Sequence, residues 1–219
     1  SEDYRIPKEF LHIYEGQTIF KDKAQKYLFD RGFDLDFCIK MGIMYAEEGR
    51  YYGRIILPFI NQKSLWDTFN ARDFLNPSVQ EYKYLNPKNG EVPMKLTDTL
   101  YNEYCLKTAS KVYITEGVFD SLTFIQKGFD SIAASGWAIG LNRKRILLNS
   151  PIKELAVIAD RGFYNKTMNQ FSFLLNTDKK VKIINMDNEK VKDANEGGLD
   201  LIFELEEKTT YLSYESLFA

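Results

Sequence analysis

Short apolar segments alternate with helix-like segments in the second half of the chain. The apolar segments have strand character and occupy residues 112–115, 131–134, 155–159 and 181–185, with helix-like residues 119–127, 142–149 and 167–175 between them. Strands separated by single helices of this length form parallel βαβ units, because each helix returns the chain to the starting edge of the sheet. The pattern therefore predicts an α/β domain built on a doubly wound parallel sheet.

The first hundred residues follow a different pattern. Residues 54–60 read RIILPFI and residues 65–72 read LWDTFNAR, with the polar turn NQKS between them. Two β-rich runs joined by a short polar turn indicate an antiparallel hairpin. We expect a further short strand at residues 82–85, and helices at residues 23–29 and 37–41 that each end at a glycine.

These patterns divide the chain of 219 residues into three parts. We expect an N-terminal α/β subdomain with an antiparallel sheet over residues 1–108. Residues 109–198 are expected to form the parallel-sheet domain, and residues 199–219 a short C-terminal helical tail. A chain of this length is long enough to bury one large core or two small ones.

Composition limits the classes of protein to consider. The formal net charge of −2 excludes a protein covered in positive charge, although a local basic track is compatible with it. Cys38 and Cys105 lie far apart in apolar segments, which indicates buried thiols in a reducing cytoplasm rather than a disulfide framework. The apolar runs are too short to cross a bilayer, so we expect no membrane association.

Three acidic residues fall at predicted strand ends in the second half. Glu116 follows VYIT, Asp160 follows LAVIA, and Asp193 lies beyond VKIIN. Parallel strands end at one edge of their sheet, so these carboxylates are expected to converge and to need a divalent cation between them. Hard oxygen ligands favour magnesium. Any one of these acids alone is as readily explained as a solvated loop residue, but three at successive strand ends predict a metal site.

The sequence around Glu116 resembles a known signature. The stretch TEGVFDSLTFIQKG is similar to the first motif of the TOPRIM domain, with Glu116, Gly117 and Asp120 at the matching positions. Glycine at this position is expected to allow a sharp backbone turn that directs the glutamate into the site. The stretch VKDANE resembles the third motif of phage primases, where Asp193 and Asn195 match.

The first half of the chain resembles DnaG-type DNA primases in particular. The matching segments are GRIILPF with Arg54, FNAR with Arg72, KYLNP with Lys83 and MKLTDTLYN with Lys95. The resemblance extends over roughly residues 24–196, and among primases of this type the chain most resembles those of large tailed bacteriophages. It implies that these four cations line a basic groove that holds template DNA and nucleotide phosphates, a role suited to arginine forks and lysine point charges.

The resemblance implies a function and a set of partners. The chain is expected to be the RNA polymerase domain of a DNA primase, which makes short RNA primers on a single-stranded DNA template from ribonucleoside triphosphates. A replicative helicase is the expected protein partner, and the host bacterial cytoplasm the expected compartment. The implied catalytic acids are Glu116, Asp160 and Asp193, and Mg²⁺ or Mn²⁺ is expected to be held by these three together with Asp120 and Asn195.

The chain departs from the family pattern at the second motif. Where D-x-D is usual, this sequence has Asp160, Arg161 and Gly162. Large tailed-phage primases vary here and keep the first Asp and a later Asn, which Asn165 matches. The number of metal ions is therefore left open, Asp187 is one further source of oxygen ligands, and Arg161 is a candidate phosphate contact.

Two other functions remain open on the sequence. A TOPRIM nuclease uses similar carboxylates, although the GRIILPF and KYLNP segments argue against it, and Gly162 keeps a non-catalytic DNA-binding module in consideration. His12 and the two cysteines cannot supply a zinc-ligand set, and His12 is expected to be structural or at the surface. Arg143, Lys144 and Arg145 are expected to form a solvated helix face rather than a binding site.

Overall fold

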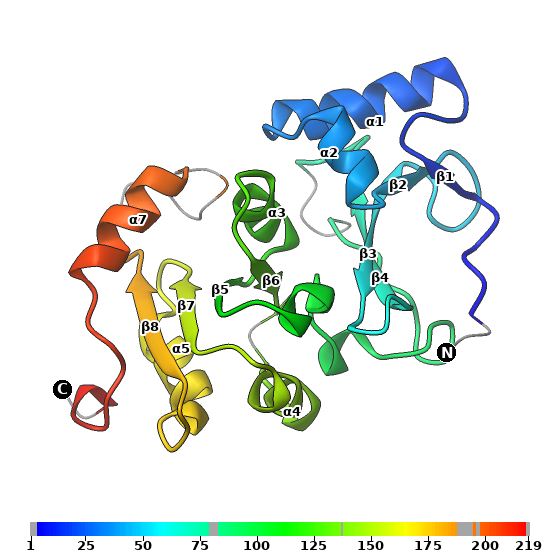
Figure 1. Cartoon of the computed structure of the whole chain (residues 1–219). Coiled ribbons are helices and arrows are strands. Elements are labelled where there is room, and N and C mark those ends of the chain that lie inside the picture. Colours follow the sequence, from blue (N-terminus) through cyan, green and yellow to red (C-terminus); the bar gives the residue numbers. More distant parts are fainter. Residues whose placement is uncertain (1–3, 79–82, 137, 188–194, 196–197, 218–219) are drawn as a thin grey trace. The chain divides into compact units, whose positions relative to one another are not determined.

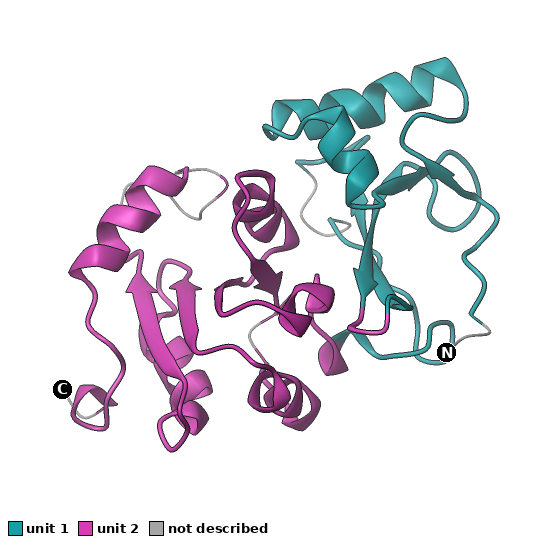
Figure 2. Cartoon of the chain, in the orientation of Figure 1, with its two compact units in different colours: residues 1–60, 64–96 teal, residues 61–63, 97–219 magenta. Residues whose placement is uncertain are grey.

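The chain consists of two compact units, which Figure 2 distinguishes by colour. The computed structural model describes residues 4–78, 83–136, 138–187, 195 and 198–217. Unit 1 contains residues 1–60 and 64–96, and unit 2 contains residues 61–63 and 97–219. The main boundary thus lies after residue 96 rather than at the expected residue 108.

The segment between these two boundaries pairs with the edge strand of the parallel sheet, residues 131–133. Tyr101 forms an antiparallel bridge with Ala133, and the Asn102 side-chain amide donates to the carbonyl oxygen of Ser131 at 2.9 Å. These hydrogen bonds make residues 97–108 part of unit 2. The sequence did not predict this, because the bonds join residues that are distant along the chain.

Unit 1 is built on a four-stranded antiparallel sheet of order β1-β2-β3-β4. Its strands are β1 (Phe10–His12), β2 (Met44–Ala46), β3 (Arg54–Ile60) and β4 (Trp66–Asp73), and its helices are α1 (Thr18–Asp30) and α2 (Leu35–Lys40). The expected hairpin of β3 and β4 and the two expected helices are present. The strand expected at residues 82–85 is reduced, in its described part, to a single bridge between Tyr84 and Arg72.

Unit 2 contains a four-stranded parallel sheet of order β6-β5-β7-β8, which confirms the fold class predicted for the second half. The arrowheads of β7 and β8 point the same way in Figure 1. The strands are β5 (Lys111–Thr115), β6 (Ser131–Ala133), β7 (Glu154–Ala159) and β8 (Lys180–Asn185). The α-helices are α3 (Val118–Gln126), α4 (Leu141–Asn149), α5 (Tyr164–Phe171) and α7 (Leu199–Lys208), and short 3₁₀ turns lie at Leu96–Asp98 (η1), Glu103–Lys107 (η2), Ser172–Leu174 (η3) and Glu215–Leu217 (η4).

Helices cover both faces of this sheet because successive strand residues point to opposite sides. On one face, Val112 of β5, Leu155 of β7 and Val181 of β8 pack with Leu147 of α4 and Phe171 of α5. On the other face, Tyr113 packs with Phe124 of α3 and with residues of α7. Burial on both faces explains the nearly continuous apolar runs of these strands.

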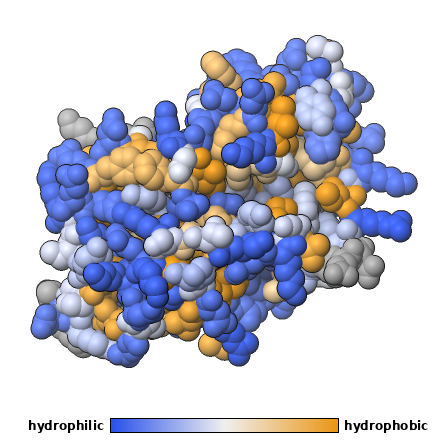
Figure 3. Space-filling view, in the orientation of Figure 1, coloured by the Kyte–Doolittle hydropathy of each residue, from blue (hydrophilic) through white to orange (hydrophobic). Residues whose placement is uncertain are grey.

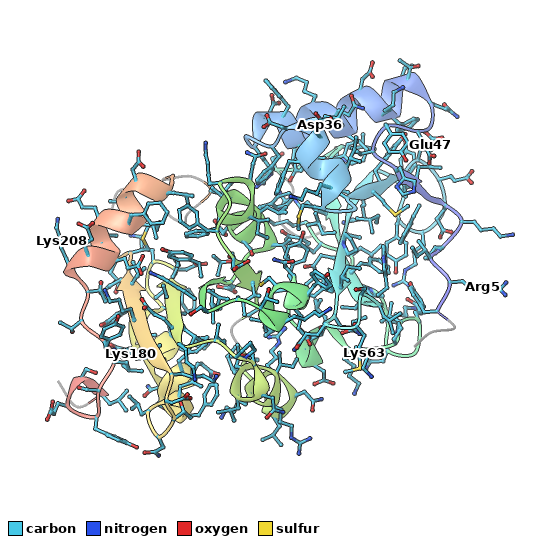
Figure 4. All side chains as sticks on the ribbon, viewed as in Figure 1. Arg5, Asp36, Glu47, Lys63, Lys180 and Lys208 are labelled. Carbon is cyan, nitrogen blue, oxygen red and sulfur yellow. The ribbon has the colours of Figure 1, made fainter. Side chains whose placement is uncertain are left out.

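The expected C-terminal tail is an integral part of unit 2. Ile202 of α7 is fully buried, and Glu206 accepts a hydrogen bond of 2.8 Å from the Tyr113 hydroxyl and forms an ion pair with Lys111 of β5. Beyond α7, the Leu212 amide donates to the carbonyl oxygen of Val181 in β8 at 2.7 Å. Figure 4 marks Lys208 at the end of α7 and Lys180 at the start of β8.

The face shown in Figure 3 carries many polar side chains, with hydrophobic patches scattered between them. In the described part of the chain, no helix has the length and apolar character needed to cross a membrane. Cys38 is buried and Cys105 is partly buried as free thiols, and burial raises the pKa of each to about 12.

Adjacent leucines of α4 test this packing. Leu147 is fully buried, whereas Leu148 is 41% exposed. We predict that Leu147→Ala lowers the free energy of unfolding by about 2–5 kcal/mol, because it removes buried methyl groups and leaves a cavity. Leu148→Ala, the matched control, is expected to change it by about 0.5 kcal/mol or less. Urea unfolding followed by circular dichroism measures both, and equal effects would contradict the packing described.

Candidate metal and nucleotide site

Two of the predicted acids lie at the carboxyl edge of the parallel sheet. Glu116 directly follows β5 and Asp160 directly follows β7, and these strands are hydrogen-bonded neighbours. Ile114 of β5 is in register with Val157 of β7. Glu116 is two residues beyond the first and Asp160 three beyond the second, so both leave the sheet at nearly the same level. Both residues are half-buried.

The remaining metal-ligand predictions are only partly described. Asp193 lies outside the described residues, and Asn195 is within them. Among the residues whose positions are described, no group of three or more His, Cys, Asp or Glu side chains is arranged to hold a metal ion. Glu116 and Asp160 nevertheless fit the donor chemistry of Mg²⁺, which proteins commonly hold through one or two carboxylates together with substrate phosphates.

Asp120 contacts the residue that represents the third motif. It is buried in the first turn of α3, and its Oδ1 accepts the backbone N–H of Asn195 at 2.8 Å. The Asn195 side-chain amide donates to the Thr123 hydroxyl at 3.1 Å. Both predicted metal ligands therefore take part in hydrogen bonds that tie the third motif to α3.

Gly117 is required for a reason other than the expected sharp turn. Its backbone is extended, with φ −85° and ψ 143°, a conformation open to any residue. A Cβ atom at this position, however, would lie 2.6 Å from Oδ2 of Asp120. The signature therefore pairs glycine with aspartate because the carboxylate packs against the glycine backbone, and our interpretation of Gly117 from sequence was wrong.

The second motif forms a turn whose geometry requires glycine. The Phe163 amide donates to the carbonyl oxygen of Asp160 at 2.9 Å, and Gly162 has φ +83°, a value that is strained for residues with a side chain. The Gly162 amide in turn donates to Oδ1 of Asp187 at 2.5 Å. A carboxylate that follows β8 thus reaches the position where the family usually has its second acid.

A buried arginine organises the loop that follows β6. Arg143 of α4 is 1% exposed, so the expected solvated helix face is wrong for this residue. Its Nη1 donates to the carbonyl oxygens of Gly136 and Ala138 at 3.0 and 2.9 Å, and its Nη2 to that of Ala134. Nε donates to the carbonyl oxygen of Thr99 at 2.9 Å. Burial lowers the pKa of Arg143 to about 10, opposed by the charge of Asp98.

The same loop fixes the backbone of Glu116. The Ser135 amide donates to the Glu116 carbonyl oxygen at 2.8 Å, and the Ala134 amide to that of Thr115 at 3.0 Å. Ser135 has φ +48°, an uncommon conformation for a residue with a side chain. Arg143 therefore stabilises a strained loop that borders one of the two described acids.

Arg54 in unit 1 has an acidic partner within its own sheet. It is buried at the start of β3, and Asp73, opposite it on β4, lies at 3.9 Å from its Nη2. Nη1 donates to the carbonyl oxygen of Ala71 at 3.2 Å. Burial lowers the pKa of Arg54 while Asp73 counteracts the shift, so its burial does not by itself require an external anion.

Arg72 is a stronger candidate for binding an anion. It is 3% exposed, and its Nη2 donates to the carbonyl oxygen of Pro77 at 3.1 Å. Its Nε and Nη1 have no hydrogen-bond partner among the described residues, and its guanidinium lies 5.3 Å from the ring centroid of Tyr84. Buried donors without partners are costly, and a phosphate would satisfy both.

The predicted cations occupy different faces of the unit 1 sheet. Tyr84 bridges to Arg72, and the Asp73 amide donates to the carbonyl oxygen of Lys83. Lys83 therefore stands opposite Asp73, on the face of Arg54, whereas Arg72 belongs to the opposite face. Lys95 is exposed in a segment outside the sheet. The structure thus gathers Arg54, Arg72 and Lys83 at one end of the sheet without aligning them in one row.

Comparison with known proteins finds matches among solved structures. No family model and no curated protein matches this sequence. The DnaG primase catalytic domain bound to single-stranded DNA aligns with a TM-score of 0.74 and 14% identity, over 89% of this chain and 74% of that one. The E. coli primase catalytic core aligns with a TM-score of 0.74 and 14% identity, over 90% and 75%. The RNA polymerase domain of Mycobacterium tuberculosis DnaG, in complex with a double-stranded DNA oligomer with a 6-nucleotide overhang, aligns with a TM-score of 0.68 and 16% identity, over 91% and 76%.

The fold therefore belongs to a class of mixed α/β chains that join an antiparallel sheet to a parallel one. Within that class, it is the fold of the DnaG primase catalytic core. This agrees with the resemblance that the motifs predicted.

Two features near the carboxyl edge were not predicted from the sequence. Arg143 gave no sign of burial, because its neighbours Lys144 and Arg145 suggested a charged surface. Phe163 and Lys166 follow Asp160 in the stretch RGFYNK, where an aromatic residue among cations is a nucleic-acid-binding pattern that could have drawn attention to them.

Arg143 and Arg145 provide a matched pair on α4. Arg143→Met leaves four carbonyl oxygens without their donor, two of them in buried and two in part-buried hydrogen bonds, so we predict a loss of about 3–5 kcal/mol in the free energy of unfolding. Arg145 is exposed, and Arg145→Met is expected to cost about 0.5 kcal/mol or less. Chemical denaturation of both variants makes the comparison, and a stable Arg143→Met protein would refute the scaffold role.

The fit between Gly117 and Asp120 is tested by adding one methyl group. Gly117→Ala is expected to cost about 1–3 kcal/mol, because the Cβ meets the Asp120 carboxylate. Gly140, which begins α4 in open space, provides the control, and Gly140→Ala should cost about 1 kcal/mol at most. Adding Asp120→Ser to Gly117→Ala should recover at least about 0.5 kcal/mol as a coupling energy. Strictly additive effects in thermal or urea unfolding would count against the contact.

Proposed function

We propose that this chain is the RNA polymerase core of a DNA primase, which joins ribonucleoside triphosphates into short primers on single-stranded DNA. The observation that carries the proposal is the placement of Glu116 and Asp160 at the ends of adjacent parallel strands in a chain with the DnaG catalytic fold. Neighbours of this fold are described as bound to single-stranded DNA and to duplex DNA with an overhang, which supports a DNA template as the partner.

The carboxyl edge of unit 2 is the proposed centre of the reaction. Glu116, Asp160 and Asp193 are the proposed catalytic acids, with Asp187 as a further carboxylate beside the Asp160 turn. Mg²⁺ or Mn²⁺ bound there would supply positive charge against the triphosphate and the transition state of nucleotidyl transfer. The half-buried setting of Glu116 and Asp160 limits competition from water. Asp120 and Asn195 are proposed either to contribute oxygen ligands or to position the third motif, and their mutual hydrogen bond supports the positioning role.

Unit 1 is proposed to bind the nucleic acid and nucleotide phosphates. Arg72 is proposed as the strongest contributor, because its Nε and Nη1, which have no hydrogen-bond partner among the described residues, suit a phosphate bidentately. Lys83 and Lys95 supply point charges, and Arg54, already paired with Asp73, is proposed to orient that end of the sheet as well as to bind. The motif resemblance supports three further parts of the proposal. These are a replicative helicase as partner, a tailed-phage origin and a location in the host bacterial cytoplasm.

The decisive experiment removes one charge from the carboxyl edge. Glu116→Gln should reduce primer synthesis on single-stranded DNA with ribonucleotides and Mg²⁺ by roughly 100-fold or more, since one electrostatic contact to the reacting centre is lost. Asp178→Asn is the control. This exposed acid lies just before β8 and pairs with Lys153, just before β7, so both are at the opposite edge of the sheet from Glu116. The variant should leave synthesis within about twofold. Circular dichroism verifies that both variants fold.

The alternatives give different results in the same assay. Oligoribonucleotide products that require Mg²⁺ or Mn²⁺ support a primase. Cleavage of the DNA without ribonucleotides identifies a nuclease instead, and DNA binding without any metal-dependent synthesis identifies a binding module. Full activity of Glu116→Gln contradicts the assignment of this carboxylate.

A further inference from the structure

An exposed aromatic residue lies beside Asp160 at the carboxyl edge of unit 2. Phe163 is 41% exposed, and it is the third residue after Asp160 along the chain. Its neighbours Tyr164 and Met168 pack against the hydrophobic core. The Phe163 ring is therefore presented to solvent by a segment whose other apolar side chains are directed inward.

Backbone hydrogen bonds hold Phe163 in place. Its amide donates to the carbonyl oxygen of Asp160 at 2.9 Å, and its own carbonyl oxygen accepts the Thr167 amide at 2.8 Å and the Thr167 hydroxyl at 2.8 Å. The preceding Gly162 is fixed by Asp187. Phe163 also occupies the N-cap position of α5, where Ser, Thr, Asp or Asn stabilise a helix and an aromatic side chain does not. Its identity is thus not explained by the needs of the helix.

One cation lies over the ring, and a second precedes it by two residues in the chain. Lys166 is exposed, and its Nζ lies 5.5 Å from the Phe163 ring centroid. Arg161, between Asp160 and Gly162, is exposed as well. An aromatic face bordered by cations matches the chemistry of a nucleotide, whose base stacks on the ring while its phosphates meet the positive charges.

We infer that Arg161, Phe163 and Lys166 form a nucleotide-stacking platform, in which a nucleobase stacks on Phe163 and the adjoining phosphates contact the two cations. The inference deepens the proposed function and rests on it for the presence of a nucleotide beside Asp160. The base and phosphate belong either to the nucleic-acid strand or to a nucleoside triphosphate, and both offer the same chemistry to the platform.

Binding measurements test the platform directly. A fluorescein-labelled oligothymidylate and ATP are the two probes, measured by anisotropy and by competition without divalent metal. Phe163→Ala should weaken binding of at least one probe by roughly 5- to 150-fold, the loss expected for one base–aromatic stack. Phe163→Trp should retain or strengthen it. Phe163→Leu, which keeps an apolar side chain without a ring, should bind as weakly as Phe163→Ala.

A second aromatic–cation pair in unit 2 provides the matched control. Tyr104 is 46% exposed with Lys107 Nζ at 4.9 Å from its ring centroid. Its chain neighbours Asn102 and Cys105 both contact Ser131 at the start of β6, at the opposite edge of the sheet from the carboxyl ends of the strands. Tyr104→Ala should leave binding within about twofold.

The cations have a separate readout. Lys166→Gln and Arg161→Gln should each reduce the slope of log affinity for the oligothymidylate against log salt concentration by about 0.7, the value for one lost phosphate contact on a single strand. Unchanged slopes would remove the cations from the inference.

The outcomes distinguish the platform from a structural role and from the proposed function. If Phe163→Ala loses affinity for the oligothymidylate alone, the ligand is the nucleic-acid strand. If it loses affinity for ATP alone, the ligand is the triphosphate. A Phe163→Ala protein that melts earlier but binds both probes normally overturns the platform, as does wild-type binding by Phe163→Leu. If the wild-type protein makes no primers but Phe163→Ala still weakens binding, the platform stands while the polymerase assignment falls. If the wild-type protein makes primers and every variant keeps its affinity, the polymerase assignment stands while the platform falls.

Discussion

The parallel pairing of β5 with β7 is the interaction on which the candidate site depends. It brings the ends of these two strands, and with them Glu116 and Asp160, to one edge of the sheet. The rest of the fold holds this arrangement in place. Apolar helices bury both faces of the sheet, and the buried Glu206 of α7 fastens the C-terminal helix to β5 through Lys111 and Tyr113. Both acids therefore follow strands whose two faces are packed against helices.

Polar contacts help to hold the loops at this edge. Arg143 collects the carbonyl oxygens of the loop after β6, Asp187 binds the Gly162 amide, and Asp120 binds the Asn195 amide. Each contact joins residues from different elements. The contacts of Arg143 with Thr99 and Ala134 are buried, so the loss of their donor would leave buried carbonyl oxygens unsatisfied.

Neither unit is basic overall, because acidic and basic residues nearly balance in each of them. The two described acids of the candidate site belong to unit 2. Unit 1 contains the buried Arg72, whose Nε and Nη1 have no hydrogen-bond partner among the described residues. These charged groups are local features that a net charge of −2 does not reveal.

The sequence by itself determined the parallel sheet, the antiparallel hairpin of β3 and β4, and the positions of Glu116 and Asp160 at strand ends, because periodicity and motif spacing are local properties. The strands β1 and β2 of the antiparallel sheet were not predicted, since their pairing is fixed by partners far along the chain. Only the tertiary structure decided that Arg143 is buried, that Gly117 makes room for Asp120, and that Arg54 already has a carboxylate partner. Those properties depend on which distant atoms a side chain meets, and no pattern in neighbouring residues encodes that.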